Sequence, residues 1–81
     1  MHITFDAAKN ETNKAKHGFD FADLTVEFFA TARFFPGNVA GRLMAIGEFQ
    51  GRVMTVIVAP LGTEGVAVIS MRSASRKERS L

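Results

Sequence analysis

The apolar residues of this chain change their spacing near residue 30. Before that point they recur at helical spacing, as in Phe21, Leu24 and Phe28, and after it they alternate or run together between turn residues. A helical first part followed by a run of short strands is typical of an α+β protein. The sequence therefore predicts two N-terminal helices packed on a small antiparallel sheet.

The first part carries clear signals for where helices begin and end. Residues 2–5 alternate polar and apolar side chains, which predicts a short strand before the helices. Asp6 can cap a helix of about ten residues that Gly18 ends, because glycine readily adopts the left-handed conformation. Asp20 can cap a second helix that begins at once.

The second part contains four strand-like segments, at residues 31–35, 42–49, 52–59 and 66–71. Short, turn-rich connections join them, so neighbouring strands are expected to be antiparallel. Residues 52–59 are apolar on both faces, which predicts a central strand with helices covering one side of the sheet.

The last residues form a capping-box pattern, Ser75-Arg76-Lys77-Glu78, which predicts the start of a short C-terminal helix. A helix this short is unstable alone, so we expect the tail to be frayed or docked. The chain has 81 residues, which predicts a single domain spanning 1–81.

Composition argues against several classes of protein. The chain has no cysteine and two histidines, so we expect no disulfide framework, no metal site and no cofactor. No apolar run approaches the roughly 18 residues of a membrane span, and the first residues do not resemble a secretory signal. We therefore expect a cytoplasmic protein without a membrane partner.

Basic residues are concentrated in the second part of the chain. Residues 33–81 carry seven arginines and lysines against three glutamates, a surplus of four. This surplus is either a solvated face or a phosphate-binding surface. Enzyme signatures such as glycine-rich phosphate loops are absent, and arginines suit chemistry on phosphodiesters because the guanidinium stabilises a crowded phosphorane.

Three residues are candidates for that chemistry, and each has a purely structural alternative. His17 can simply interact with the carbonyls at a helix C-terminus, which is the favoured interpretation from the residue alone. Arg72 ends a predicted strand beside the basic tail, where it either binds a phosphate or is solvated. Arg42 can protect a sheet edge or form a cross-strand ion pair.

Residues 5–18 resemble the opening motif of the BrnT family, Phe/Trp-Asp-x-x-Lys-x-x-x-Asn-x-x-Lys-His-Gly. The resemblance continues through residues 21–22, 42–47, 68–74 and 76–79, and so spans nearly the whole chain. It implies an endoribonuclease toxin of a type II toxin–antitoxin pair with a compact RelE-like fold. It also implies a BrnA-like ribbon-helix-helix antitoxin as partner, through which alone the complex contacts operator DNA.

On this interpretation RNA is cleaved without a metal, and the substrate's own 2′-hydroxyl is the nucleophile. The expected catalytic residues are Arg42, Arg72 and His17, and the expected RNA-binding residues are Lys9, Arg76, Lys77 and Arg79. The chain departs from the family pattern at Gly41, at 59–62 and at Ala67. A catalytically weakened binding module, serving as antitoxin scaffold and co-repressor, is therefore the competing hypothesis, and a nonspecific nucleic-acid binder is a third.

The eight phenylalanines predict a partner chain. A domain this small hides only about 60 to 65% of its unfolded surface, so that many aromatic rings are hard to bury. We expect an apolar patch completed by the antitoxin, in a heterotetramer, or by a second copy in a homo-oligomer.

Overall fold

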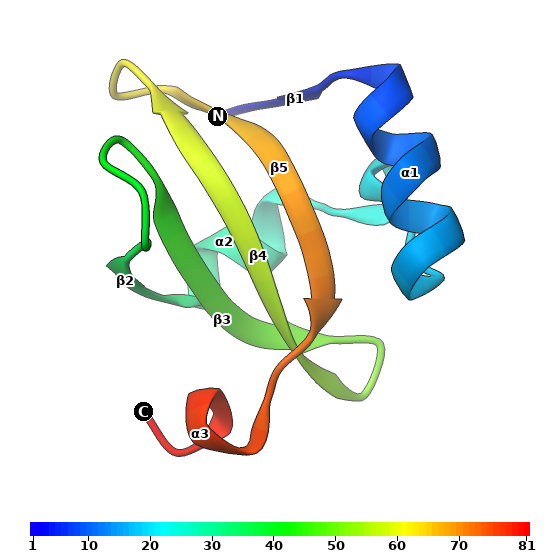
Figure 1. Ribbon diagram of the computed structural model, residues 1–81. Coiled ribbons are helices and arrows are strands. Elements are labelled where there is room, and N and C mark those ends of the chain that lie inside the picture. The colour runs from blue at the N-terminus through cyan, green and yellow to red at the C-terminus, as the bar shows by residue number, and fades with distance from the viewer.

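The computed structural model describes residues 1–81 as one five-stranded sheet with helical segments behind it and beside it and a short helix at its C-terminal end (Figure 1). The sheet has the order β1-β5-β4-β3-β2. The strands are β1 (His2–Phe5), β2 (Arg33–Pro36), β3 (Leu43–Phe49), β4 (Arg52–Leu61) and β5 (Gly65–Ser73). The helical segments are α1 (Ala7–His17), the 3-10 turn η1 (Phe21–Asp23), α2 (Val26–Thr31) and α3 (Arg76–Arg79). The α+β class is confirmed, and β4 is the central strand, as its two apolar faces predict.

The sheet is mixed, so the prediction of an antiparallel sheet is wrong for one strand. β2, β3, β4 and β5 pair antiparallel along the short connections, but β1 pairs parallel with β5, from His2 opposite Gly65 to Phe5 opposite Val68. No short loop joins β1 to β5, since α1, η1, α2 and three strands lie between them in the chain. Short connections require antiparallel pairing only between strands that follow one another, so β1 is free to pair parallel with β5.

The caps of α1 match the prediction from sequence. The Asp6 carboxylate accepts hydrogen bonds from the amides of Ala8 and Lys9, at 2.8 and 3.0 Å. Gly18 adopts φ 81° and its amide donates to the Lys14 carbonyl, which ends the helix.

The predicted second helix is instead split into η1 and α2, with extended backbone at Leu24 and Thr25. The break lets Phe21 as well as Phe28 and Phe29 reach the sheet, and all three rings are buried. Tertiary packing therefore outweighs the helical spacing of this segment.

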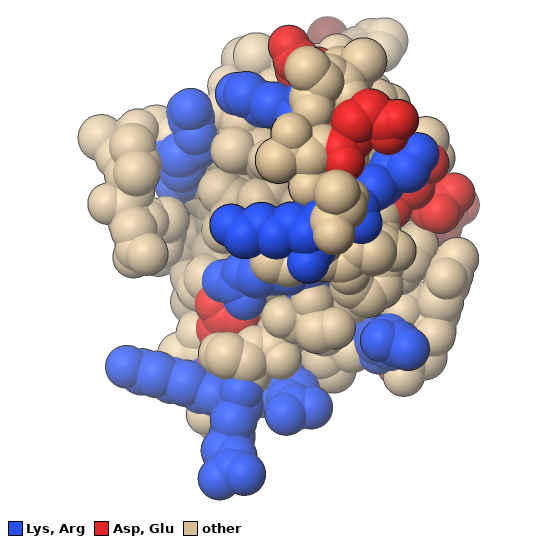
Figure 2. Space-filling model, turned by 45° about the vertical axis from the view of Figure 1, so that its right-hand side comes forward, with Lys and Arg blue, Asp and Glu red and all other residues tan.

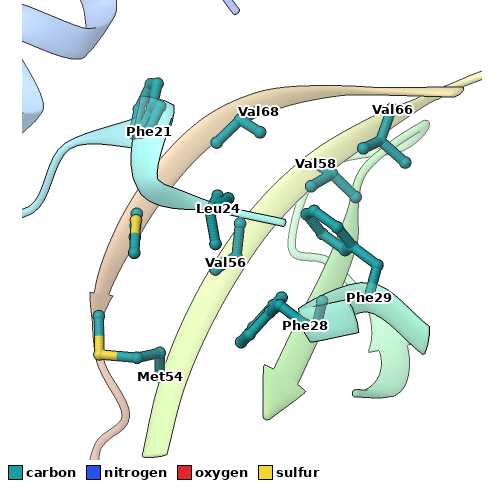
Figure 3. Packing of buried hydrophobic residues seen from close by; sticks show 11 residues of the cluster. Phe21, Leu24, Phe28, Phe29, Met54, Val56, Val58, Val66 and Val68 are labelled. Carbon is teal, nitrogen blue, oxygen red and sulfur yellow. The ribbon is translucent and has the colours of Figure 1, made fainter. Parts of the chain in front are cut away.

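One apolar cluster fills the space between the helical segments and the sheet (Figure 3). Phe21 lies against β5, while Phe28 and Phe29 face Val56 and Val58 of β4. α2 lies so close to β3 that a Cβ on Gly47 would stand 3.2 Å from both Ala32 and the Phe28 ring. Glycine at this position is what allows the helix to pack so tightly.

Most phenylalanines are accommodated within this fold. Phe34 on β2 is the one exposed phenylalanine, with 42% of its surface accessible.

No helix of the chain is long and apolar enough to cross a membrane.

Candidate functional site

The face of the sheet opposite η1 and α2 carries a row of four residues, three of them polar, across four strands. The pairing register places Arg33, Ile46, Thr55 and Arg72 side by side on β2, β3, β4 and β5. These residues alternate with the buried row that contains Val56, so their side chains point away from η1 and α2. We call this the open face.

Arg72 forms a two-armed ion pair with Glu78 of α3. Its Nη1 donates to Glu78 Oε1 at 2.7 Å and its Nη2 donates to Oε2 at 2.8 Å. The Thr55 hydroxyl and the Ser75 amide also donate to Oε1, each at 2.9 Å. The hydrogen bonds from Arg72, Ser75 and Thr55 lower the pKa of Glu78 to about 2, and the bond to Glu78 raises the pKa of Arg72.

α3 is docked on the open face, which is one of the two states expected for the tail. The Ser75 hydroxyl accepts from the Glu78 amide, so the predicted capping box is present. Before the helix, the Ala74 amide donates to the Val53 carbonyl, and after it Arg33 Nη1 donates to the Leu81 carbonyl at 2.8 Å. These contacts hold both ends of the segment against the sheet.

A cavity of about 220 Å³ lies between α3 and the β2–β3 loop, and we call it the open-face pocket. Met44 and Ile57, which are cross-strand neighbours, give it an apolar floor. Arg72 and Lys77 supply positive charge, Glu78 supplies a negative charge and Asn38 contributes an amide. An apolar floor with a few convergent polar groups is the usual character of a ligand site.

A second basic cavity, of about 420 Å³, lies between α1 and the edge of β5, and we call it the α1–β5 groove. Lys9, Lys16, His17 and Ser70 line it, and neither lysine is engaged in an ion pair. Ser70 is the cross-strand partner of Ile57, which lines the open-face pocket. Cross-strand partners lie about 5 Å apart, so the two cavities are neighbours across β5.

Asn13 positions α1 against that edge. β1 covers β5 only as far as Val68, which leaves the next backbone groups of β5 unpaired on that side. The Asn13 amide group donates to the Met71 carbonyl at 3.0 Å, and the Met71 amide donates to Asn13 Oδ1 at 3.1 Å. The side chain thus replaces one missing strand partner.

The structure brings together only some of the residues predicted from sequence. Arg72 and Lys77 share the open-face pocket, with Arg76 and Arg79 exposed on the same short helix. Lys9 and His17 share the α1–β5 groove.

Arg42 lies apart from both groups. It directly precedes β3 on the open face. Four residues separate it from Ile46, which stands in the row with Thr55 and Arg72, and this spacing corresponds to about 13 Å along the strand. Its half-buried side chain joins none of the ion pairs in the structure.

Lysine and arginine side chains gather at the lower end of the molecule, where α3 lies, and across the middle, where α1 comes forward (Figure 2). Acidic side chains in this view lie mainly at the upper right. Thr55 and Glu78 were not predicted from sequence as parts of the site. The capping-box pattern contained Glu78, but only the strand register shows that its carboxylate meets Arg72.

The fold and site define a small α+β protein whose open sheet face carries a pocket lined by Arg72, Lys77 and Glu78. Residues 5–78 match the model of a family described as the ribonuclease toxin BrnT of type II toxin–antitoxin systems. This chain is similar to the Brucella abortus ribonuclease toxin BrnT, whose crystal structure superposes with a TM-score of 0.85. The two sequences are 57% identical, and the match covers 94% of this chain and 99% of that one. No curated protein shows a significant match. The chain belongs to the BrnT family and is a BrnT-type ribonuclease toxin of a type II toxin–antitoxin system.

Proposed function

We propose that this protein is a metal-independent endoribonuclease whose open-face pocket holds the scissile phosphodiester. The observation that carries the proposal is the position of Arg72, a guanidinium of β5 held by Glu78 of α3 at the wall of a pocket with an apolar floor. Its planar fork matches phosphate oxygens and stabilises the charge that develops on them. The substrate's 2′-hydroxyl attacks the adjacent phosphorus, and the 5′-oxygen of the next nucleotide leaves.

The α1–β5 groove gives the RNA a path to that pocket. Lys9 and Lys16 bind backbone phosphates there, and His17 serves as a proton shuttle for the same substrate. Arg76, Lys77 and Arg79 hold the strand beyond the scissile bond. Arg42 contributes a further phosphate contact on the open face. We also propose that the fold is RelE-like.

The experiment that tests the function is cleavage of RNA by the purified protein. We expect products that end in a 2′,3′-cyclic phosphate or its opened form, and rates unchanged by a metal chelator. Arg72→Ala should lower the rate about a hundredfold or more, and Arg72→Lys should recover little because an ammonium cannot make the forked contact. A chelator that abolishes cleavage, or an alanine variant as active as the parent, would contradict the mechanism.

Stability must be measured alongside this rate. From sequence alone, Arg72→Ala is expected to leave folding nearly unchanged, but the structure shows that it removes the partner of Glu78. Rates should therefore be compared where unfolding curves show both proteins to be native. Lys14→Ala is the matched control, because Lys14 pairs with Glu11 and Asp20 away from the pocket.

A BrnA-like ribbon-helix-helix antitoxin is the partner we propose, and operator DNA is contacted only through it. It presents acidic side chains to Arg42, Arg72 and Arg76 and so excludes RNA. Its association rate should fall several-fold between roughly 50 and 500 mM salt, since the screening length shortens from about 14 to about 4 Å. Overexpression that leaves growth normal while antitoxin binding persists would instead support the scaffold hypothesis.

A further inference from the structure

Four hydrogen-bond donors converge on the carboxylate of Glu78. Two are the terminal nitrogens of Arg72, one is the hydroxyl of Thr55 and one is the backbone amide of Ser75. All four donor–acceptor distances lie between 2.7 and 2.9 Å. A single anionic group thus receives a forked guanidinium, a hydroxyl and an amide at once.

The same donors suit a phosphate group. Guanidinium groups bind carboxylates and phosphates with the same two-armed geometry, and hydroxyl and amide groups complete the contacts to further phosphate oxygens. Thr55 is 0% exposed, lies on the open face rather than in the apolar cluster, and directs its hydroxyl at Glu78. Such a buried hydroxyl is costly on the central strand unless it has a partner there.

We propose that Glu78 occupies an anion cradle, formed by Arg72, Thr55 and the Ser75 amide, in place of a phosphate of the RNA substrate. The inference rests on the proposed ribonuclease function and adds its regulation. With Glu78 in place both terminal nitrogens of Arg72 are engaged. When the substrate phosphate takes its position, Glu78 leaves with the turn that carries it.

The exchange makes the site selective for extended RNA. The carboxylate is tethered beside the cradle, and its effective concentration is on the order of millimolar or higher, so a weakly held isolated anion competes poorly. An RNA strand also gains attraction from Lys77 and Arg76, which flank the cradle in sequence. Only an anion with several phosphates therefore displaces Glu78 readily.

The test is Glu78→Gln in the full chain. Glutamine keeps the capping box, because it can also accept from the Ser75 amide, but it lacks the charge that competes with phosphate. We expect inorganic phosphate, measured by calorimetric titration, to bind about tenfold more tightly to Glu78→Gln than to the parent. RNA cleavage should rise several-fold. The double variant Arg72→Ala/Glu78→Gln should lose the gain in phosphate affinity.

The outcomes separate the cradle from the ribonuclease function. If the parent cleaves RNA and the folded Glu78→Gln protein binds phosphate no better than the parent, the cradle is overturned and the ribonuclease function stands. Tighter phosphate binding without cleavage by either protein would support the cradle and contradict the ribonuclease function.

A second measurement uses the parent protein, so it does not depend on the folding of a variant. A 2′-deoxy oligonucleotide lacks the nucleophile and is not cleaved by the proposed mechanism. At saturation it should speed amide exchange at Glu78 and Arg79, which bond to Ser75, and leave the Met71 amide protected. Unchanged exchange at Glu78 and Arg79 would overturn the proposal.

Discussion

The face of the sheet that η1 and α2 cover buries Phe21, Val56 and Val58 in a cluster without a charged group, whereas the open face buries Thr55 beneath an ion pair. Burial of apolar area is non-directional, so the first face tolerates many arrangements of similar volume. Hydrogen bonds to an ionised group are directional, so the second face holds one guanidinium in one orientation. The first face therefore supplies most of the stability, and the second places the chemistry.

The sharpest test of this division is Phe21→Ala. The ring is 0% exposed and packs edge-on against Phe5, so its loss should lower the free energy of unfolding by about 4 kcal/mol. Phe34→Ala is the control, because that residue is already 42% exposed, and it should cost less than about 1 kcal/mol. Urea unfolding measures both free energies, and equal losses would show that the buried ring adds no more stability than the exposed one.

Asn13→Ala tests whether the packing of α1 against β5 also depends on a polar contact. The buried amide donates to the carbonyls of Phe19 and Met71 and accepts from the Met71 amide, so its removal should cost about 2 kcal/mol. Thr12→Ala on the same helix should cost under about 0.5 kcal/mol, since Thr12 is exposed. If thermal unfolding shows the two variants to be alike, α1 is held by apolar contacts alone.

The contribution of the open face to the free energy of unfolding should depend on pH in the acid range. The folded pKa of Glu78, about 2, lies below its ordinary value of about 4.3, so its contribution is complete above pH 5 and is lost as pH falls toward 2. Glu78→Gln should be about 1–2 kcal/mol less stable than the parent at pH 6, and this difference should shrink at pH 3 and below.

That comparison isolates Glu78 from other acids. Asp20 also has a lowered pKa, chiefly because Asn10 donates a hydrogen bond to it, but Asp20 is present in both proteins. A stability difference independent of pH would mean that the Glu78 side chain acts through packing rather than through its charge.

The smallest expected effect concerns single lysines. Lys77→Ala should weaken RNA binding about threefold near 0.15 M salt and reduce the salt dependence by roughly one phosphate contact. Lys14→Ala, whose ammonium lies 3.1 Å from Glu11, should change neither. Filter binding across a salt series measures both, and equal effects would mean that RNA senses overall charge rather than the open face.

Local signals in the sequence were sufficient for much of the fold. Asp6, Gly18 and the Ser75 capping box act over one turn of chain, so their residues alone predict where α1 begins and ends and where α3 begins. The split between η1 and α2 was not predictable in this way. The split lets Phe21, Phe28 and Phe29 all pack against the sheet. The helical spacing of the apolar residues contains no information about where that sheet lies.

The α+β class, the central position of β4 and the BrnT resemblance all follow from spacing and motifs along the chain, so the residues alone were enough to predict them. The parallel pairing of β1 with β5, the separation of Lys9 and His17 from Arg72, and the contact of Glu78 with Arg72 and Thr55 emerge only in the folded molecule. The two groups of features differ in the range of the interactions that stabilise them. A cap or a turn is stabilised by neighbours in sequence, whereas a strand register and an ion pair between a strand and a docked helix exist only after distant segments have packed together.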